Sequence, residues 1–153
     1  MVNICRISEG DAVYIPLQNG RMYSLGVIAR GTSKTVLLGY LFAPRPIKPT
    51  LQDAELLIPS DVYFICRFFA TPFKLGRWEV LGKISKFSKR LWKNPKFLRY
   101  SPGIGMRAIG YMEDNPLLKV SERRAKKAEL DSLFEDSIRG DLSIEDDLDQ
   151  LET

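Results

Sequence analysis

Short apolar segments alternate with turn residues over residues 10–42, which is the pattern of successive β-strands. In residues 12–17 every second position is aliphatic, so this segment predicts a strand with one apolar face. Pro16 lacks a backbone donor and therefore favours an edge or a bulge in that strand. The Asn-Gly pair within residues 18–21 predicts a tight hairpin turn. We therefore expect a three-stranded meander whose other strands span residues 22–30 and 35–42.

The segment that follows this meander begins with a rigid connection and a short helix. Three prolines in residues 43–49 fix an extended chain, which neither a helix nor a central strand tolerates. Residues 50–53 resemble a capping box and predict a helix that reaches about Leu57, with Pro59 ending it. The β-forming run that contains Arg67 would be a central strand if Arg67 lies at its exposed end. The strands predicted in this part of the chain span residues 62–69 and 77–84.

The C-terminal part of the chain combines one more strand, near residues 97–100, with two helical patterns. Residues 121–134 have an i,i+4 pair, Glu122 and Lys126, and an apolar stripe, so they predict a helix. Ser143 is expected to cap a final short helix with acidic residues in its first turn. The apolar edge of that helix is formed by Ile144, Leu148 and Leu151.

These elements predict an α+β fold that is mainly β. We expect a curled antiparallel sheet, or a small and partly open barrel, of five to six strands with a short helix and one or two C-terminal helices. The chain of 153 residues is long enough to bury a core without disulfides or a metal. We expect residues 1–112 to form a β-rich domain and residues 113–153 to form a helical, acidic extension packed on it or tethered to it.

The composition excludes most enzyme classes. The chain contains no histidine, which removes imidazole as a base, a proton shuttle or a metal ligand. Cys5 and Cys66 stand outside any CxxC or zinc-ligand spacing and are expected to be buried, inert thiols. The GxG of residues 103–105 lacks the further glycine of a dinucleotide site and predicts a mobile loop. We therefore expect no enzyme, and no catalytic, cofactor-binding or metal-binding residues.

The N-terminal residues lack the basic start and the apolar stretch of a signal peptide. The longest apolar segments are too short to span a bilayer. The sequence therefore predicts a cytoplasmic protein without a membrane partner.

The net charge of +4 conceals a division along the chain. Residues 1–112 carry 17 Lys and Arg against 6 Asp and Glu, whereas residues 113–153 carry 6 against 13. Such asymmetry favours a nucleic acid, an acidic protein surface or the chain's own tail as the counterpart of the basic region. Charge alone does not choose among these three.

Residues 83–107 are the most basic segment, with eight Lys and Arg, no acid and several interleaved aromatic residues. Cations that contact phosphates and rings that stack on bases are how proteins hold single-stranded nucleic acid without reading its sequence. In the competing interpretation, Trp92 and Phe97 pack onto the sheet while the lysines point into solvent. The remaining interpretations are a protein partner and the acidic tail folding back on this segment.

The tail from Glu135 to Glu152 carries eight acids and one base, Arg139. It is either a solvated terminus or a helix held by its apolar residues with its acids facing outward. Such an acidic surface would suit a basic partner. The apolar residues available to hold the helix are Leu142, Ile144, Leu148 and Leu151.

A set of short motifs in residues 7–100 resembles a known family, the immunity protein 26 family of bacterial polymorphic-toxin systems. The resemblance consists of a Gly-Asp start, an apolar strand ending in Pro-Leu, a turn glycine, a Gly-Val strand and a late Gly-x-Trp strand. In this chain these motifs are Gly10-Asp11, Ile15-Pro16-Leu17, Gly20, Tyr23-Ser24-Leu25-Gly26-Val27-Ile28, Gly76-Arg77-Trp78 and Leu81-Gly82-Lys83.

The resemblance implies a small, mainly β protein that binds a cognate toxin and blocks it without chemistry of its own. The motif residues all have roles in the fold, so they do not name the toxin contacts. We expect the contact surface to be either the basic segment or the acidic tail, which predict opposite charges on the toxin. The candidate contact residues are Lys86, Lys89, Arg90, Trp92 and Lys93 in the first, and Asp146, Asp147 and Asp149 in the second. A single-stranded nucleic-acid-binding module is the alternative function.

Overall fold

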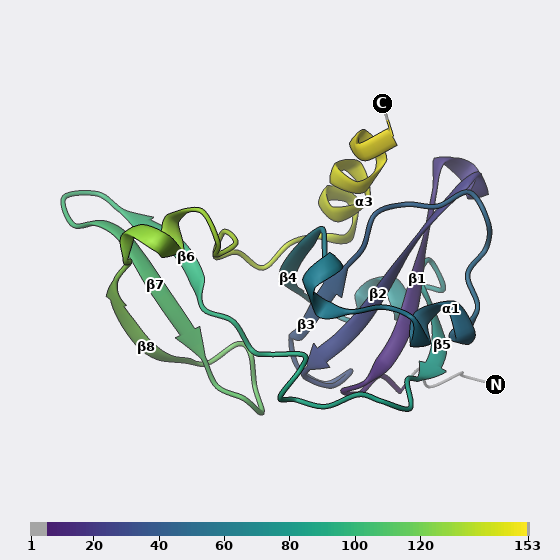
Figure 1. Ribbon diagram of the computed structural model, residues 1–153, viewed down its shortest axis with the longest axis horizontal. Coiled ribbons are helices and arrows are strands. Elements are labelled where there is room, and N and C mark those ends of the chain that lie inside the picture. Colours follow the sequence, from purple (N-terminus) through teal and green to yellow (C-terminus); the bar gives the residue numbers. More distant parts are fainter. Residues whose placement is uncertain (1–5, 153) are drawn as a thin grey trace.

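A computed structural model describes residues 6–152 of the chain as a mostly β protein with two antiparallel sheets (Figure 1). Cys5 therefore lies outside the described residues. The larger sheet has five strands in the order β4-β3-β2-β1-β5. Its strands confirm the five predicted in residues 11–84: β1 (Asp11–Leu17), β2 (Met22–Arg30), β3 (Leu37–Leu41), β4 (Phe64–Phe68) and β5 (Glu79–Lys83).

The hairpin between β1 and β2 keeps the predicted pairing but uses a longer turn. Residues Gln18–Gly20 form a 3-10 turn, η1, in which Gly20 has a φ of 84°. Strand β5 pairs with β1 only from Asp11 to Tyr14, with a bulge between Ala12 and Val13. Pro16 lies beyond the end of β5, so β1 is an edge at the position of its proline, as expected.

Arg67 does not lie at an exposed strand end, so the condition for a central strand is not met, and its strand is not central. Strand β4 is the edge strand next to β3, and the Arg67 side chain is buried. The edge is covered because segments from the C-terminal part of the chain pack against it. The backbone carbonyl of Pro116 and the carboxylate of Asp136 accept hydrogen bonds from the Arg67 guanidinium. These contacts offset the desolvation cost of burying its charge.

The chain forms a second sheet in addition to the single sheet that the sequence predicts. It has three strands in the order β6-β7-β8, namely β6 (Phe97–Ser101), β7 (Gly105–Tyr111) and β8 (Lys119–Arg124). The predicted strand near residues 97–100 is confirmed as β6, and the GxG of residues 103–105 lies at the β6–β7 turn. Figure 1 shows this sheet beyond the β3 and β4 side of the larger sheet; the two do not close into a barrel.

The prediction of a helix over residues 121–134 is wrong. Residues 119–124 belong to β8, and a short 3-10 helix, η3 (Lys127–Leu130), follows. Glu122 does not pair along a helix with Lys126. It instead forms ion pairs with Arg107 on the neighbouring strand, at 3.1 Å, and with Lys119 on its own strand, at 2.9 Å. A charge pattern that suits a helix therefore serves cross-strand pairing here.

Two of the predicted helices are present. The capping box of Thr50 and Asp53 opens α1 (Leu51–Glu55), as expected. The C-terminal helix α3 (Asp141–Asp149) begins two residues before Ser143, with Gly140 as its N-cap, so Ser143 is not the cap. The remaining helices are α2 (Thr71–Lys74) and the 3-10 turns η2 (Pro59–Asp61) and η4 (Gln150–Glu152).

The hydrophobic core lies on both faces of the five-stranded sheet. Strand β1 shows the division, because Val13 and Ile15 belong to one cluster and Ala12 and Tyr14 to the other. Helices α2 and α3 contribute to the first cluster. The segment after β5 and the inner ends of β6 and β7 contribute to the second. In the described residues, no helix has the length and apolar character that crossing a membrane requires.

Candidate functional site

The candidate contact residues of the basic segment lie on the loop between β5 and β6, residues 84–96, which we call the basic loop. Trp92 is only 3% exposed, and its ring meets the rings of Tyr40 and Phe42 edge-on, with centroids 5.2 and 6.1 Å away. Phe97 is also buried. The interpretation in which these rings pack onto the sheet is therefore confirmed. Trp92, a candidate contact residue, is buried beneath the exposed surface of the basic loop.

The buried side chain of Arg30 on β2 fastens the basic loop to the sheet. This side chain, only 2% exposed, reaches from β2 into the loop. There it donates hydrogen bonds to the backbone carbonyls of Trp92, at 2.8 Å, and Lys89, at 3.2 Å. The Arg30 charge is compensated by an ion pair with Glu113. Burial raises the pKa of Glu113, but the hydrogen bond and charge of Arg30 outweigh this effect and lower it below its ordinary value.

A tyrosine supports the same loop. The Tyr40 hydroxyl donates a 2.7 Å hydrogen bond to the backbone carbonyl of Lys93. Burial raises the pKa of Tyr40 to about 12, so the hydroxyl keeps its proton and remains a donor at physiological pH. Together with Arg30 and Trp92, Tyr40 holds the loop backbone in one position.

The cations of the basic loop point into solvent. Lys86, Lys89, Arg90 and Lys93 are all exposed. Lys89 forms an ion pair with Glu9 at 3.3 Å. Within residues 6–152, none of the other three has an ion-pair partner. Lys86, Arg90 and Lys93 are therefore exposed, uncompensated cations on a fixed backbone.

The acidic candidates lie on the opposite side of the larger sheet, because α3 packs on the first core cluster and Trp92 on the second. Ile144 and Leu148 are fully buried, and Leu151 is partly buried, so the tail is a docked helix as one interpretation expected. Leu142 is exposed and does not hold the helix.

Most acids of α3 are neutralised within the chain. Arg77 pairs with Asp141 at 2.5 Å and also with Glu145, while Arg139 pairs with Asp147. Of the three acidic candidates, Asp146 is exposed, and Asp147 and Asp149 are half-buried. The tail also meets the basic segment at one ion pair, between Asp136 and Arg99. Its acids therefore serve mainly to hold the tail in place.

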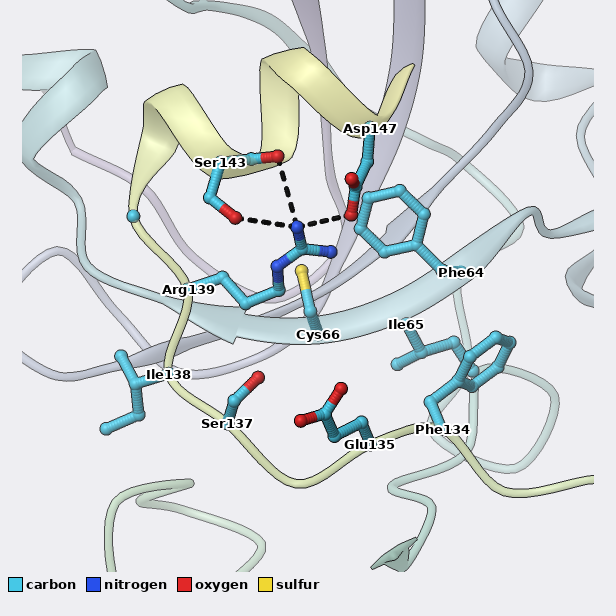
Figure 2. A pocket seen from close by; sticks show the side chains of 11 residues that line it. Phe64, Ile65, Cys66, Phe134, Glu135, Ser137, Ile138, Arg139, Ser143 and Asp147 are labelled. Carbon is cyan, nitrogen blue, oxygen red and sulfur yellow. Dashed lines mark hydrogen bonds and ion pairs between the residues drawn. The ribbon is translucent and has the colours of Figure 1, made fainter. Parts of the chain in front are cut away.

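A cavity of about 480 Å³ lies between α3, β4 and the segment before the helix (Figure 2). Cys66 and Arg139 both line it. Burial raises the pKa of the Cys66 thiol to about 12, so the thiol is neutral and a poor nucleophile. The Arg139 guanidinium donates to the Ser143 hydroxyl at 2.7 Å and is paired with Asp147, which leaves no uncompensated cation for an anionic ligand. The expectation of a buried thiol is confirmed for Cys66.

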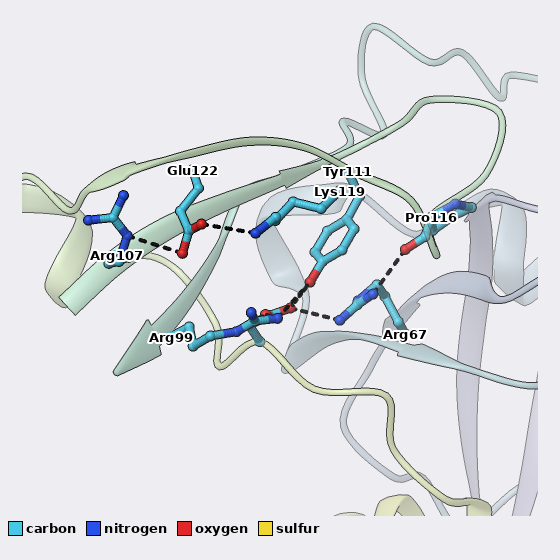
Figure 3. Close-up of polar contacts among 8 residues, drawn as sticks. Arg67, Arg99, Arg107, Tyr111, Pro116, Lys119 and Glu122 are labelled. Atoms are coloured by element: carbon cyan, nitrogen blue, oxygen red, sulfur yellow. Dashed lines mark hydrogen bonds and ion pairs between the residues drawn. The ribbon is translucent and has the colours of Figure 1, made fainter. Parts of the chain in front are cut away.

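An ion network that sequence reasoning missed joins the two sheets (Figure 3). The Asp136 side chain is fully buried and accepts hydrogen bonds from Arg67 of β4, at 2.7 Å, and from the Tyr111 hydroxyl of β7, at 2.6 Å. Arg99 of β6 donates to its other oxygen at 2.8 Å. The Arg67 guanidinium also lies 3.7 Å from the Tyr111 ring centroid. This network is structural, because every charge in it has a partner.

The same pairing weakens the nucleic-acid alternative. Arg99 and Arg107, both in the basic segment, are paired with Asp136 and Glu122. Trp92 and Phe97 are buried and offer no ring face on which a base can stack. Tyr100 is the large exposed ring of the segment among the described residues. Within those residues, no group of three or more Cys, Asp or Glu side chains is placed to hold a metal ion.

Comparison with known proteins gives one result. The sequence model of the family described as Immunity protein 26 matches residues 8–105. No curated protein and no solved structure matches the chain. The matched segment includes the whole five-stranded sheet and the basic loop, and it ends at the start of β7. Because it covers well over half of the chain, the protein belongs to the immunity protein 26 family.

Proposed function

We propose that the protein is a non-catalytic immunity protein that neutralises a cognate bacterial toxin by direct contact through the basic loop. The family's description indicates a toxin-neutralising role. The observation that supports this contact surface is the set of uncompensated cations, Lys86, Arg90 and Lys93, on a loop fastened by Arg30. The partner surface is then acidic.

The charge and the rigidity of the basic loop both favour it as the contact surface. Charges that lack partners within the chain can be complemented by a partner, which speeds association and selects against wrong partners. A loop that is already fixed loses little conformational entropy when it binds. The acidic helix is also held in place, but it lacks the charge advantage, because Arg77 and Arg139 already compensate most of its acids. Asp147 and its neighbours are therefore the weaker of the two candidate sets.

The experiment that tests neutralisation is co-expression with the toxin encoded beside this gene in its native bacterial locus. We expect the untagged toxin to be captured by the tagged immunity protein, and growth to be restored in the same cells. The activity of the purified toxin should then fall to zero at a fixed molar ratio of immunity protein to toxin. A substoichiometric endpoint would indicate catalytic inactivation and would overturn the non-catalytic mechanism. No capture and no rescue, with tight and salt-sensitive binding to single-stranded nucleic acid, would overturn the toxin-binding proposal.

A further inference from the structure

A small apolar groove opens beside the basic loop. It has a volume of about 250 Å³ and is formed between the turn that links α1 to η2 and the first half of the loop. Its lining includes Leu56, Ile58, Ile84, Lys86, Leu91 and Trp92. This volume lies below the range of about 300–1,000 Å³ that is typical of sites for small-molecule ligands. It suits one or two inserted side chains better.

The groove combines a buried floor with exposed aliphatic walls. Trp92 and Ile84 form the floor and are buried. On the walls, Leu56 is 81% exposed, Leu91 59% and Ile58 51%. Exposed aliphatic side chains that gather around one groove are typical of protein interaction sites, whereas single ones scattered over a surface are not.

The two walls are tied together, so the groove exists before anything binds. Ser85 of the basic loop donates a 2.7 Å backbone hydrogen bond and a 2.9 Å hydroxyl hydrogen bond to the two carboxylate oxygens of Glu55 in α1. These contacts fasten the loop to the helix. They also engage the carboxylate of Glu55, which is the acidic group in the groove.

The positive charges around the groove indicate the chemistry of the segment that binds there. Lys86 forms part of its wall, and Arg90 and Lys93 flank the Leu91 and Trp92 pair in the sequence. All three cations are exposed and, within the described residues, without an ion-pair partner. An apolar centre with a charged rim is how the energetically dominant part of a protein interface is built.

We propose that this groove receives an apolar side chain of the toxin, from a segment in which Asp or Glu residues flank that side chain. The apolar side chain fills the space between Leu56 and Leu91, and the flanking carboxylates pair with Lys86 and Arg90. This inference rests on the proposed toxin-binding function and adds the chemistry of the toxin segment. The groove supplies affinity by burying apolar surface, and the cations fix the orientation of the segment.

The test replaces the exposed leucines of the groove and measures affinity for the toxin. The double variant Leu56→Ser and Leu91→Ser removes both walls. The matched control, Leu75→Ser with Leu142→Ser, changes two leucines elsewhere that are 67% and 62% exposed. We expect the groove variant to bind the toxin at least 30-fold more weakly and the control to stay within threefold of the wild type. Thermal unfolding of both variants should match the wild type, because the replaced side chains are exposed.

The outcomes separate this inference from the proposed function. Capture of the toxin by the wild type with unchanged affinity in the groove variant would overturn the groove and leave toxin binding intact. Failure of the wild type to capture the toxin would overturn both. Dimerisation of the free protein that the groove variant abolishes would assign the groove to a second copy of this chain and overturn the inference. A second variant, Ile58→Arg, fills the groove with a larger, charged side chain instead of removing its walls. It should weaken toxin binding to a similar degree.

Discussion

The guanidinium of Arg30 donates a 2.8 Å hydrogen bond to the backbone carbonyl of Trp92, although the two residues are 62 positions apart in the sequence. The contact links the centre of the larger sheet to the basic loop. Because the same guanidinium also bonds the carbonyl of Lys89, one buried side chain fixes two points of the loop. The position of the exposed cations therefore depends on a residue that no partner touches.

Replacement of Arg30 by methionine should destabilise the fold and weaken toxin capture together. The variant leaves the carbonyls of Lys89 and Trp92 without their donor and Glu113 without its counter-charge. Because the Glu113 side chain is 57% exposed, water can solvate its charge, and the loss comes mainly from the two carbonyls, at about 1–3 kcal/mol in free energy of unfolding. Urea denaturation measures this loss. Arg21→Met, at an exposed arginine, is the control and should cost less than about 0.5 kcal/mol. Equal stability of the two variants would mean that Arg30 does not fasten the loop.

Trp92 should behave as a core residue. Trp92→Ala removes a ring that is 3% exposed and packed against Tyr40 and Phe42, so we expect a loss of about 3–5 kcal/mol in free energy of unfolding. Tyr100→Ala removes an exposed ring and should cost less than about 0.5 kcal/mol. Thermal and urea unfolding measure both. A stable Trp92→Ala variant would place the ring at the surface and restore the stacking role required by a nucleic-acid site.

Asp136 should hold the two sheets together. Asp136→Asn removes the negative charge that faces Arg67 and Arg99, leaving the buried Arg67 guanidinium uncompensated at a cost of about 3 kcal/mol. Hydrogen exchange should show faster opening of β6 and β7 than of β1 and β2. The exposed Asp131 provides the control variant, Asp131→Asn. Uniform exchange across both sheets in the Asp136 variant would contradict a joining role.

Glu129 should contribute to stability at neutral pH and lose this contribution in acid. Arg123, through two 2.7 Å hydrogen bonds, and the backbone of Lys126 lower the pKa of Glu129 from 4.5 to about 2. A folded-state pKa below the unfolded one means that the stabilisation is fully present above pH 4.5 and is lost as the pH falls to about 2. The difference in melting temperature between the wild type and Glu129→Gln should therefore shrink over that range. A difference that is independent of pH would refute this linkage.

Much of the larger sheet was predictable because its signals are local. The alternation in residues 12–17, the turn glycine Gly20 and the capping box of Thr50 each need only a few neighbouring residues, and all three are found in the structure. The reason for Gly26 appears only in the structure, since a Cβ there would lie 2.9 Å from a methyl carbon of Leu41 on the paired strand β3.

The parts that sequence reasoning missed depend on distant partners. Residues 119–124 carry charges that suit a helix, but their pairing with β7 places Glu122 beside Arg107. Asp136 stands in an acidic tail, where nothing nearby shows that it will be buried between Arg67 and Arg99. An arginine within the apolar run of residues 62–69 was the one local hint of a buried ion pair. Tertiary contacts decided these elements.

Toxin binding by the basic loop is tested by the affinity of the toxin for a charge-reversed loop. The variant Lys86→Glu, Arg90→Glu and Lys93→Glu is compared with a matched control that reverses three exposed cations elsewhere, Lys74→Glu, Arg124→Glu and Lys127→Glu. We expect the loop variant to lose at least about 10-fold in affinity for the toxin and to fail to rescue growth, while the control binds as the wild type does. Equal binding of toxin to both variants would contradict the assignment of the contact to the basic loop.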